Sequence, residues 1–161
     1  MQNFYEFDTE SMGGNSNFQF MPINDIDIFP QINNCVCVVD VIPLSGKAWL
    51  NGLSLSKTLD FEELPGEADA GDYFKTKISG MVPKLTSEYL ALFSEMKQHR
   101  HIVKLTDNNG KIRLSGNATA GMKFTYSQTS EPTPAGFSGF RFTFYLEKTS
   151  ESPFVEIAVV S

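Results

Sequence analysis

The stretch GFRFTFYLEK, residues 139–148, decides the fold class because its apolar residues occupy every second position. Side chains alternate between the two faces of an extended strand, so this spacing puts all of them on one face. The stretch GMKFTYS, residues 121–127, shows the same alternation upstream. The apolar positions are Met122, Phe124, Tyr126, Phe140, Phe142, Phe144 and Leu146. The two segments predict two strands, each with one apolar face.

A hairpin is predicted just before these strands. Two alternating runs, HIVKLTD (101–107) and KIRLSG (111–116), flank the sequence Asp-Asn-Asn-Gly at 107–110. An Asn-Gly pair tolerates the positive φ angles of tight hairpin turns. The segment from residue 101 to residue 116 is therefore expected to be a β-hairpin.

One helix is predicted over residues 87–98. Thr86 is a suitable N-cap, Glu88 puts a negative charge in the first turn, and Leu85 with Leu90 has the spacing of a hydrophobic staple. An apolar stripe at helical spacing follows, formed by Tyr89, Leu92, Phe93 and Met96. The helix is expected to pack this stripe against the strands.

Further strands are predicted between residues 35 and 61. CVCVVDVI (35–42) is nearly all apolar and β-branched, as in a strand covered on both faces. Cys35 and Cys37 are read as two core side chains in a reducing compartment, because residues two apart close a disulfide poorly. KAWLNGLSLSKTLDF (47–61) predicts one or two more strands, with Gly52 at a bulge between them.

Two segments read as irregular. Residues 1–17 are polar, rich in Asn, Ser and Gly, and predict either a flexible N-terminal arm that orders on a partner or a disordered terminus with no role. Residues 60–72, DFEELPGEADAGD, contain six acids, no Lys or Arg, one proline and two glycines, and predict a long acidic loop.

These segments together predict a mainly β (α+β) fold: an antiparallel β-sandwich or rolled sheet with one flanking α-helix. The chain of 161 residues is predicted to contain a flexible N-terminal arm (1–17) and a single β-rich domain (18–161). The formal charge of −6 argues against a broad basic face for nucleic acid. No secretory signal and no apolar run long enough for a membrane helix are visible, which favours synthesis in the cytoplasm.

Two metal sites are considered and not favoured. Cys35 and Cys37 with His99 and His101 supply the ligand types of a zinc site, but one residue between the cysteines is a tighter spacing than usual. Core cysteines and histidines at a helix end explain them more simply. Glu67, Asp69 and Asp72 could offer oxygen ligands to calcium, but they lack the regular alternation of a calcium loop, so a solvated or partner-facing loop is favoured.

The sequence contains no constellation that supports catalysis. No serine has a Gly-x-Ser-x-Gly context, both histidines adjoin Arg100, and no phosphate-binding loop is present. We expect no enzyme activity and no cofactor. Lys97 and Arg100 follow the predicted helix, where positive charge complements the helix dipole, and they could also face the acidic segment of a neighbouring copy.

The chain resembles small structural proteins of phage and prophage tails. The resemblance lies in FQFMPINDIDIFPQI (18–32), in the strand and Trp49 region, in the helix and hairpin VPKLTSEYLALFSEMKQHRHIVKLTDNNGKIRLSG (82–116), and in GFRFTFYLEKTSESPF (139–154). It implies a tail-tube-like or tail-terminator-like subunit that assembles into rings, commonly hexamers, and ends in the virion tail. Tube, terminator and baseplate roles are not separated.

The same resemblance implies that the N-terminal arm and the acidic segment join neighbouring rings. The expected assembly contacts are Phe4, Tyr5, Phe7, Glu62, Glu63, Glu67, Asp69, Asp72, Lys97 and Arg100. An acidic tube wall would also let DNA pass, because a basic wall would hold its phosphates. The alternative is a monomeric β-sandwich binding module for carbohydrate or protein, which should expose a compact aromatic patch that includes Trp49.

Overall fold

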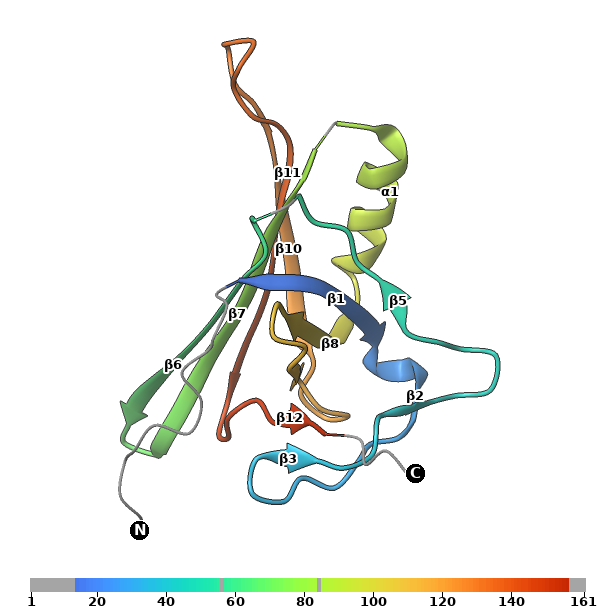
Figure 1. The fold of residues 1–161 in the computed structure, drawn as a ribbon, viewed down its shortest axis with the longest axis vertical. Coiled ribbons are helices and arrows are strands. Elements are labelled where there is room, and N and C mark those ends of the chain that lie inside the picture. The colour runs from blue at the N-terminus through green and yellow to red at the C-terminus, as the bar shows by residue number, and fades with distance from the viewer. Residues whose placement is uncertain (1–13, 56, 84, 157–161) are drawn as a thin grey trace.

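Twelve strands, one α-helix and one 3-10 helix form the described part of the chain, which in this computed structural model is residues 14–55, 57–83 and 85–156 (Figure 1). The elements are β1 (Asn15–Pro22), η1 (Ile23–Asp25), β2 (Ile26–Ile28), β3 (Val36–Cys37), β4 (Ile42–Pro43), β5 (Leu50–Asn51), β6 (Asp60–Ala68), β7 (Gly71–Pro83), α1 (Ser87–Met96), β8 (Arg100–Asp107), β9 (Ile112–Ser115), β10 (Met122–Ser130), β11 (Ser138–Lys148) and β12 (Phe154–Val155). The fold is mainly β with one helix, as the sequence predicted.

Most strands belong to one strongly curved sheet. Its order is β3-β12-β9-β8-β10-β11-β7-β6, and β1 joins it by pairing with β8 on one side and β5 on the other. The β3–β12 pair is parallel, whereas the other pairs in this sheet are antiparallel. In Figure 1, β1 runs across the long strands β7, β10 and β11, and α1 stands beside them. β2 and β4 form a separate two-stranded sheet.

The curvature encloses a cluster of buried aromatic side chains, here called the phenylalanine core. It joins Phe18 and Phe20 of β1 to the strands that β1 crosses and to α1. Its buried members are Phe18, Phe20, Leu59, Ile78, Val82, Phe93, Met96, Val103, Leu105, Met122, Phe124, Phe140, Phe142 and Phe144. Aromatic rings bury a large area each, so this cluster supplies much of the apolar burial that holds the sheet closed.

A smaller second core covers the opposite faces of β1 and β8. Its buried members are Met21, Cys37, Val41, Ile102, Leu114 and Val155. Because side chains alternate, Met21 and Ile102 point away from the phenylalanine core, which their strand neighbours Phe20 and Val103 enter. β1 and β8 are therefore covered on both faces.

The predicted strands around residues 121–127 and 139–148 are confirmed as β10 and β11. They pair antiparallel from Lys123↔Tyr145 to Ser130↔Ser138, so both strands extend into the stretch between the two predicted segments. The pair extends past the end of β7, whose Pro83 is opposite Gly139, and its tip projects from the molecule (Figure 1).

The predicted hairpin after the helix is also confirmed. β8 and β9 pair from Val103↔Ser115 to Thr106↔Ile112. The turn contains Gly110 at φ +79°, a conformation that glycine adopts without steric cost. The side chain of Asp107 accepts hydrogen bonds from the backbone N–H groups of Asn109 and Lys111.

The helix forms where it was predicted and ends two residues earlier, at Met96. Thr86 is its N-cap, and its hydroxyl accepts a hydrogen bond from the Tyr89 N–H at 3.3 Å. Phe93 and Met96 are buried, whereas Leu85 and Leu90, the expected staple, are both exposed. Lys97 is the C-cap residue.

The strand predicted over residues 35–42 is wrong. Only Val36–Cys37 and Ile42–Pro43 are strands, each of two residues. Asn34 and Cys35 have positive φ angles of 50° and 61°, which no regular strand accommodates. Cys35 is exposed and Cys37 is buried, so the two cysteines are not both core residues.

The acidic loop predicted over residues 60–72 is also wrong, because this segment is β6, the turn at 69–70 and the start of β7. β6 is an edge strand, so one of its sides has no partner strand. Pro65, which lacks an N–H group, is tolerated in such a strand. Gly71, at φ +118°, permits the tight turn into β7.

Two other expectations change. β1 begins at Asn15, inside the predicted arm, while residues 1–13 lie outside the described residues. Within residues 47–55, only Leu50–Asn51 is a strand. Gly52 lies against Phe18, and an added Cβ there would come within 2.1 Å of the Phe18 ring. Glycine at position 52 therefore allows the backbone to approach the Phe18 ring closely.

Candidate functional site

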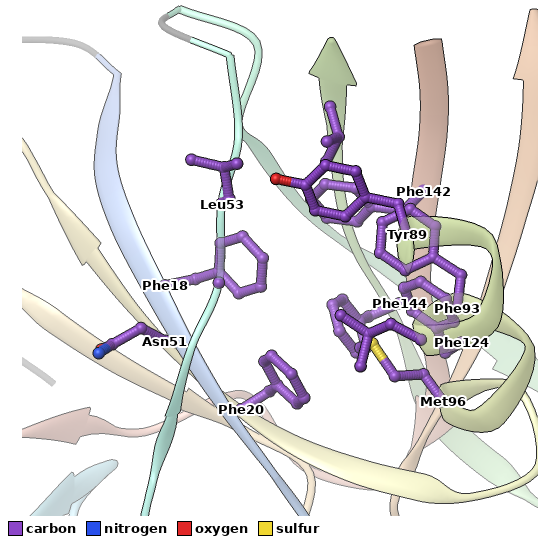
Figure 2. Close-up of a pocket in the computed structure, with 13 residues that line it drawn as sticks. Phe18, Phe20, Asn51, Leu53, Tyr89, Phe93, Met96, Phe124, Phe142 and Phe144 are labelled. Carbon is purple, nitrogen blue, oxygen red and sulfur yellow. The ribbon is translucent and has the colours of Figure 1, made fainter. Parts of the chain in front are cut away.

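An apolar pocket lies between β1, β5, α1 and the strands β10 and β11, with a cavity volume of about 110 Å³ (Figure 2). Aromatic rings dominate its wall. The lining residues are Phe18, Phe20, Asn51, Gly52, Leu53, Val82, Tyr89, Leu92, Phe93, Met96, Phe124, Phe142 and Phe144. No carboxylate, imidazole, amine or thiol is among them, and the Tyr89 phenol is the one titratable group of the lining, so the pocket is suited to holding an apolar group.

Ring contacts across the sheet build the inner wall of the pocket. Phe18 lies 5.4 Å from Phe142 between ring centroids, and Phe20 lies 6.2 Å from Phe144. Phe93 from α1 contacts Phe124 at 5.4 Å. These separations are in the range preferred by interacting aromatic pairs, so the wall is formed by side chains that also stabilise the core.

The mouth of the pocket has two exposed leucines. Leu53 follows β5 and is 54% exposed, and Leu92 on α1 is 44% exposed. Figure 2 shows Leu53 on the chain opposite the helix that carries Tyr89, Phe93 and Met96. Asn51 turns its amide away from the rings and accepts a hydrogen bond from Gln19 at 2.9 Å. An apolar group entering from solvent would therefore meet apolar atoms on both sides.

Exposed apolar side chains concentrate in two neighbourhoods. Residues 28–55, here called the apolar segment, carry nine of them, and residues 85–92 carry three. They are Ile28, Ile32, Val38, Val39, Ile42, Leu44, Leu50, Leu53, Leu55, Leu85, Leu90 and Leu92. Of the two leucines at the mouth of the pocket, Leu53 belongs to the first group and Leu92 to the second. The pocket therefore lies where the apolar segment meets α1.

The predicted acidic contacts lie on the β6–β7 hairpin. Glu62, Glu67, Asp69 and Asp72 are exposed there. Lys97 and Arg100 are exposed after α1. In Figure 1 the β6–β7 turn lies at the lower left and α1 begins at the upper right, and in the described part of the chain no ion pair joins these acidic and basic groups. Phe4, Tyr5 and Phe7 lie outside the described residues.

Glu63 differs from the other predicted contacts because it points inward. Its carboxylate accepts hydrogen bonds from the Thr76 hydroxyl at 2.7 Å and from the Ser152 hydroxyl at 2.7 Å. Lys148 Nζ lies 3.6 Å away, and both side chains of this ion pair are about nine-tenths buried, at 10% and 8% exposure. Glu63 therefore holds β6 to the segment that follows β11, and it is not a surface contact.

The same cluster contains a serine beside a lysine, an arrangement that some hydrolases use. Lys148 Nζ donates to the Ser152 hydroxyl at 2.6 Å, and Ser115 contacts that hydroxyl at 3.0 Å. Ser152 is only 4% exposed and its hydroxyl already has three partners. A substrate has no access to a hydroxyl buried and held in this way. We therefore interpret the cluster of Glu63, Lys148 and Ser152 as a structural contact, here called the clamp.

Burial and hydrogen bonds in this clamp shift the pKa values of Glu63 and Lys148. Burial alone would raise the pKa of Glu63, but hydrogen bonds from Ser152 and Thr76 and the charge of Lys148 lower that pKa below its usual value. Burial lowers the pKa of Lys148, and the charge of Glu63 opposes this. The hydrogen bonds and the nearby amine thus favour the charged form of the Glu63 carboxylate.

The four residues considered for zinc do not form a site. His101 is buried in the phenylalanine core, with Nε2 2.9 Å from the Met96 carbonyl oxygen. Cys37 belongs to the second core, while Cys35 and His99 are exposed. In the described part of the chain, no group of three or more His, Cys, Asp or Glu residues could hold a metal ion.

Trp49 does not form the exposed patch expected of a binding module. It is half-buried against the second core, and Lys104 Nζ lies 4.4 Å from the centre of its ring. Lys104 also pairs with Asp40 at 2.6 Å. One face of the Trp49 ring is therefore occupied by a cation.

The comparisons with known proteins name no relative: no protein-family model, no curated protein and no solved structure matches the chain. Among the described residues, no helix is both long and apolar enough to cross a membrane.

Sequence reasoning missed both the pocket and the clamp. The signal for the pocket was present in the leucines of residues 50–55, which were assigned to strands, and in Leu92, which was assigned wholly to the core. Glu63 carried no local signal, because Ser152 is 89 residues away in the sequence.

Proposed function

We propose that the protein is a non-enzymatic structural subunit of a phage or prophage tail and assembles with copies of itself. The observation that carries the proposal is the concentration of exposed apolar side chains on the apolar segment and α1. Monomeric soluble proteins rarely expose large contiguous apolar surfaces, and such surfaces mark interaction sites. A neighbouring copy would cover them.

The shape of the molecule supports assembly. The β10–β11 hairpin projects beyond the sheet (Figure 1), with a tip ordered by its own contacts. The Glu131 N–H donates to the Phe137 carbonyl at 3.0 Å, and Arg141 lies over the Phe137 ring at 5.3 Å. A projection that is stiff without a partner can insert between neighbouring subunits at little cost in conformational entropy.

The charge distribution is compatible with a tube that conducts DNA. The chain carries a net charge of −6, and the β6–β7 hairpin presents Glu62, Glu67, Asp69 and Asp72 to solvent. An acidic wall repels phosphates, whereas lysines and arginines would bind them and slow the passage of DNA. On this proposal the acidic hairpin faces the lumen or the basic residues Lys97 and Arg100 of the next copy.

A monomeric binding module is the second candidate function, and the pocket is the observation that favours it. Its apolar lining would select an apolar group from a ligand or a protein partner. Sugar binding is less well supported, because the Trp49 ring is half-buried beneath Lys104.

Light scattering over a concentration series tests the proposal. We expect the mass to rise above 17.9 kDa with concentration and electron microscopy to show rings or tubes. The double variant Val38→Glu, Val39→Glu should shift association to higher concentration, because these side chains are 60% and 54% exposed in the single chain. Tyr145→Glu, at an exposed residue of β11 outside the apolar segment, is the control.

A mass of 17.9 kDa at every concentration, with no assemblies in electron micrographs, would contradict the structural role. Specific saturable binding of an apolar ligand by that monomer would favour the binding module.

A further inference from the structure

The pocket between β5 and α1 matches a particular kind of occupant. A cavity of about 150 Å³ lined by apolar side chains holds one benzene molecule, which sets the scale for such sites. The pocket here has about 110 Å³, is walled by phenylalanine rings, and opens between the exposed leucines Leu53 and Leu92. One aromatic side chain entering through the mouth would fill it and cover both leucines.

We propose that the pocket receives an aromatic side chain from residues 4–7 of a second copy of this chain. This inference rests on the proposed function, because it requires the copies to associate. The segment Phe4-Tyr5-Glu6-Phe7 places three aromatic rings in four residues. Aromatic anchors seated in a preformed apolar pocket supply much of the binding energy in typical interfaces.

Charge complementarity supports the same occupant. Residues 1–13 contain Glu6, Asp8 and Glu10 and no Lys or Arg. Met96 lines the pocket, and the chain beyond it presents the exposed cations Lys97 and Arg100. An incoming acidic segment with aromatic anchors therefore meets an apolar pocket with positive charge beside it, which favours both encounter and register.

The point where the segment joins the domain is compatible with donation to another copy. Gly14 lies at the β8–β9 turn, where its carbonyl accepts a hydrogen bond from the Asn108 N–H at 3.1 Å. The α1 side of the pocket is at the other end of β1, since Met96 contacts His101 and His101 is opposite Pro22 in the sheet. The segment is thus attached at the end of β1 that is remote from Met96. The Leu53 side of the mouth lies nearer to that end, since the Gly52 N–H donates to the Phe18 carbonyl, so the trapping experiment below distinguishes the copies.

Substitutions in the full chain provide the first test. Phe4→Ala, Tyr5→Ala and Phe7→Ala together should raise the dissociation constant for self-association at least tenfold, as hot-spot aromatics do. Gln2→Ala, Asn3→Ala and Thr9→Ala together form the matched control in the same segment and should leave it unchanged. On the pocket side, Leu92→Glu should reproduce the loss, whereas Ala91→Glu, exposed on the same helix but outside both the pocket lining and the exposed apolar set, should not. Thermal melts verify that each variant is folded.

Disulfide trapping distinguishes the copies. All chains carry Cys35→Ser to remove the exposed native thiol. Mixing a Phe7→Cys chain with a Leu53→Cys chain under mild oxidation should give a covalent heterodimer. If the doubly substituted chain instead yields only an intrachain disulfide, the segment closes its own pocket and the inference is overturned.

The failures of the two proposals are distinguishable. Association that persists in the triple aromatic variant, with no heterodimer trapped, would overturn this inference and leave the structural role standing. A chain that stays monomeric at every concentration would overturn both.

Discussion

The β10–β11 pair and the apolar segment have similarly apolar sequences and opposite outcomes. Along β11, Phe140, Phe142 and Phe144 are each no more than 2% exposed. In the apolar segment, Val38 and Val39 are 60% and 54% exposed, although CVCVVDVI has no fewer apolar residues than GFRFTFYLEK. Apolar content therefore does not predict burial in this protein, whereas alternation does.

The physical reason lies in register. An alternating strand has one apolar face, and a slip of one residue would expose it all, so its pairing is strongly specified. A continuous apolar run has no preferred face. Here the backbone turns at Asn34 and Cys35, and the Asp40 carboxylate accepts a hydrogen bond from the Val41 N–H at 2.8 Å. Cys37 and Val41 enter the second core, and the valines between them stay outside.

The largest effect is expected in the phenylalanine core. Phe144→Ala removes a fully buried ring that contacts Phe18, Phe124 and His101. It should lower the free energy of unfolding by about 4 kcal/mol, measured by urea denaturation. Tyr145→Ala, at the adjacent exposed position, should cost less than about 1 kcal/mol. Equal losses at the two positions would contradict the difference between the faces of β11.

A slightly smaller loss is expected at the clamp between β6 and the segment after β11. Glu63→Gln removes the counter-ion of the buried Lys148 side chain and the carboxylate that accepts from Thr76 and Ser152, and should cost about 3 kcal/mol. The neighbouring exposed Glu62→Gln should change stability by no more than about 0.5 kcal/mol in the same denaturation assay. A Glu63 variant as stable as the Glu62 variant would show that the clamp is not needed.

A smaller, pH-dependent effect is expected from His101. Burial among Phe20, Phe124 and Phe144 lowers its pKa below 6.5, and nearby His99 acts in the same direction, while the hydrogen bond with the Met96 carbonyl opposes them. The unfolded chain then takes up the proton more readily than the folded chain. Stability should be constant above the unfolded pKa of about 6.5 and fall as the pH drops below it.

Unfolding measured between pH 5 and pH 8 checks this expectation. The variant His101→Leu removes the titrating group and should remove the decline in that range. A decline of the same size in this variant would assign it to other groups.

The smallest effect on the single chain is expected in the apolar segment. Val38→Ser with Val39→Ser should change the free energy of unfolding by no more than about 0.5 kcal/mol each, because both side chains are exposed. A loss of several kcal/mol, measured at concentrations where the chain is monomeric, would show that the valines are buried in solution. The contrast between the two regions would then fail.

The parts of the fold that were predictable are those specified locally. The alternation in β10 and β11, the Asn-Gly turn and the Thr86 cap each depend on residues close in the sequence, and each is found in the structure. The strand at β6 was missed because Pro65 and the acids argue against a strand unless its place at the sheet edge is known. That place depends on pairing across the whole chain.

The candidate site was less predictable for the same reason. The pocket combines β1, β5, α1 and β10–β11, which no local pattern relates. In the sequence, Leu92 fits the apolar stripe of the helix as well as the buried Phe93 does. Its place at the mouth of the pocket depends on the position of β5. The Glu63 clamp likewise depends on a contact between distant segments.

The pairing of β1 with β8 has a consequence for synthesis on the ribosome. Ser16 bonds to Thr106, 90 residues later in the chain, and β1 pairs along its length with β8. Until β8 has emerged, Phe18, Phe20 and Met21 lack the strand that places them in the two cores. Pairings this distant in sequence form slowly and leave apolar strands open to aggregation in the meantime. The nascent chain must therefore carry β1 without this partner strand until β8 has been synthesised.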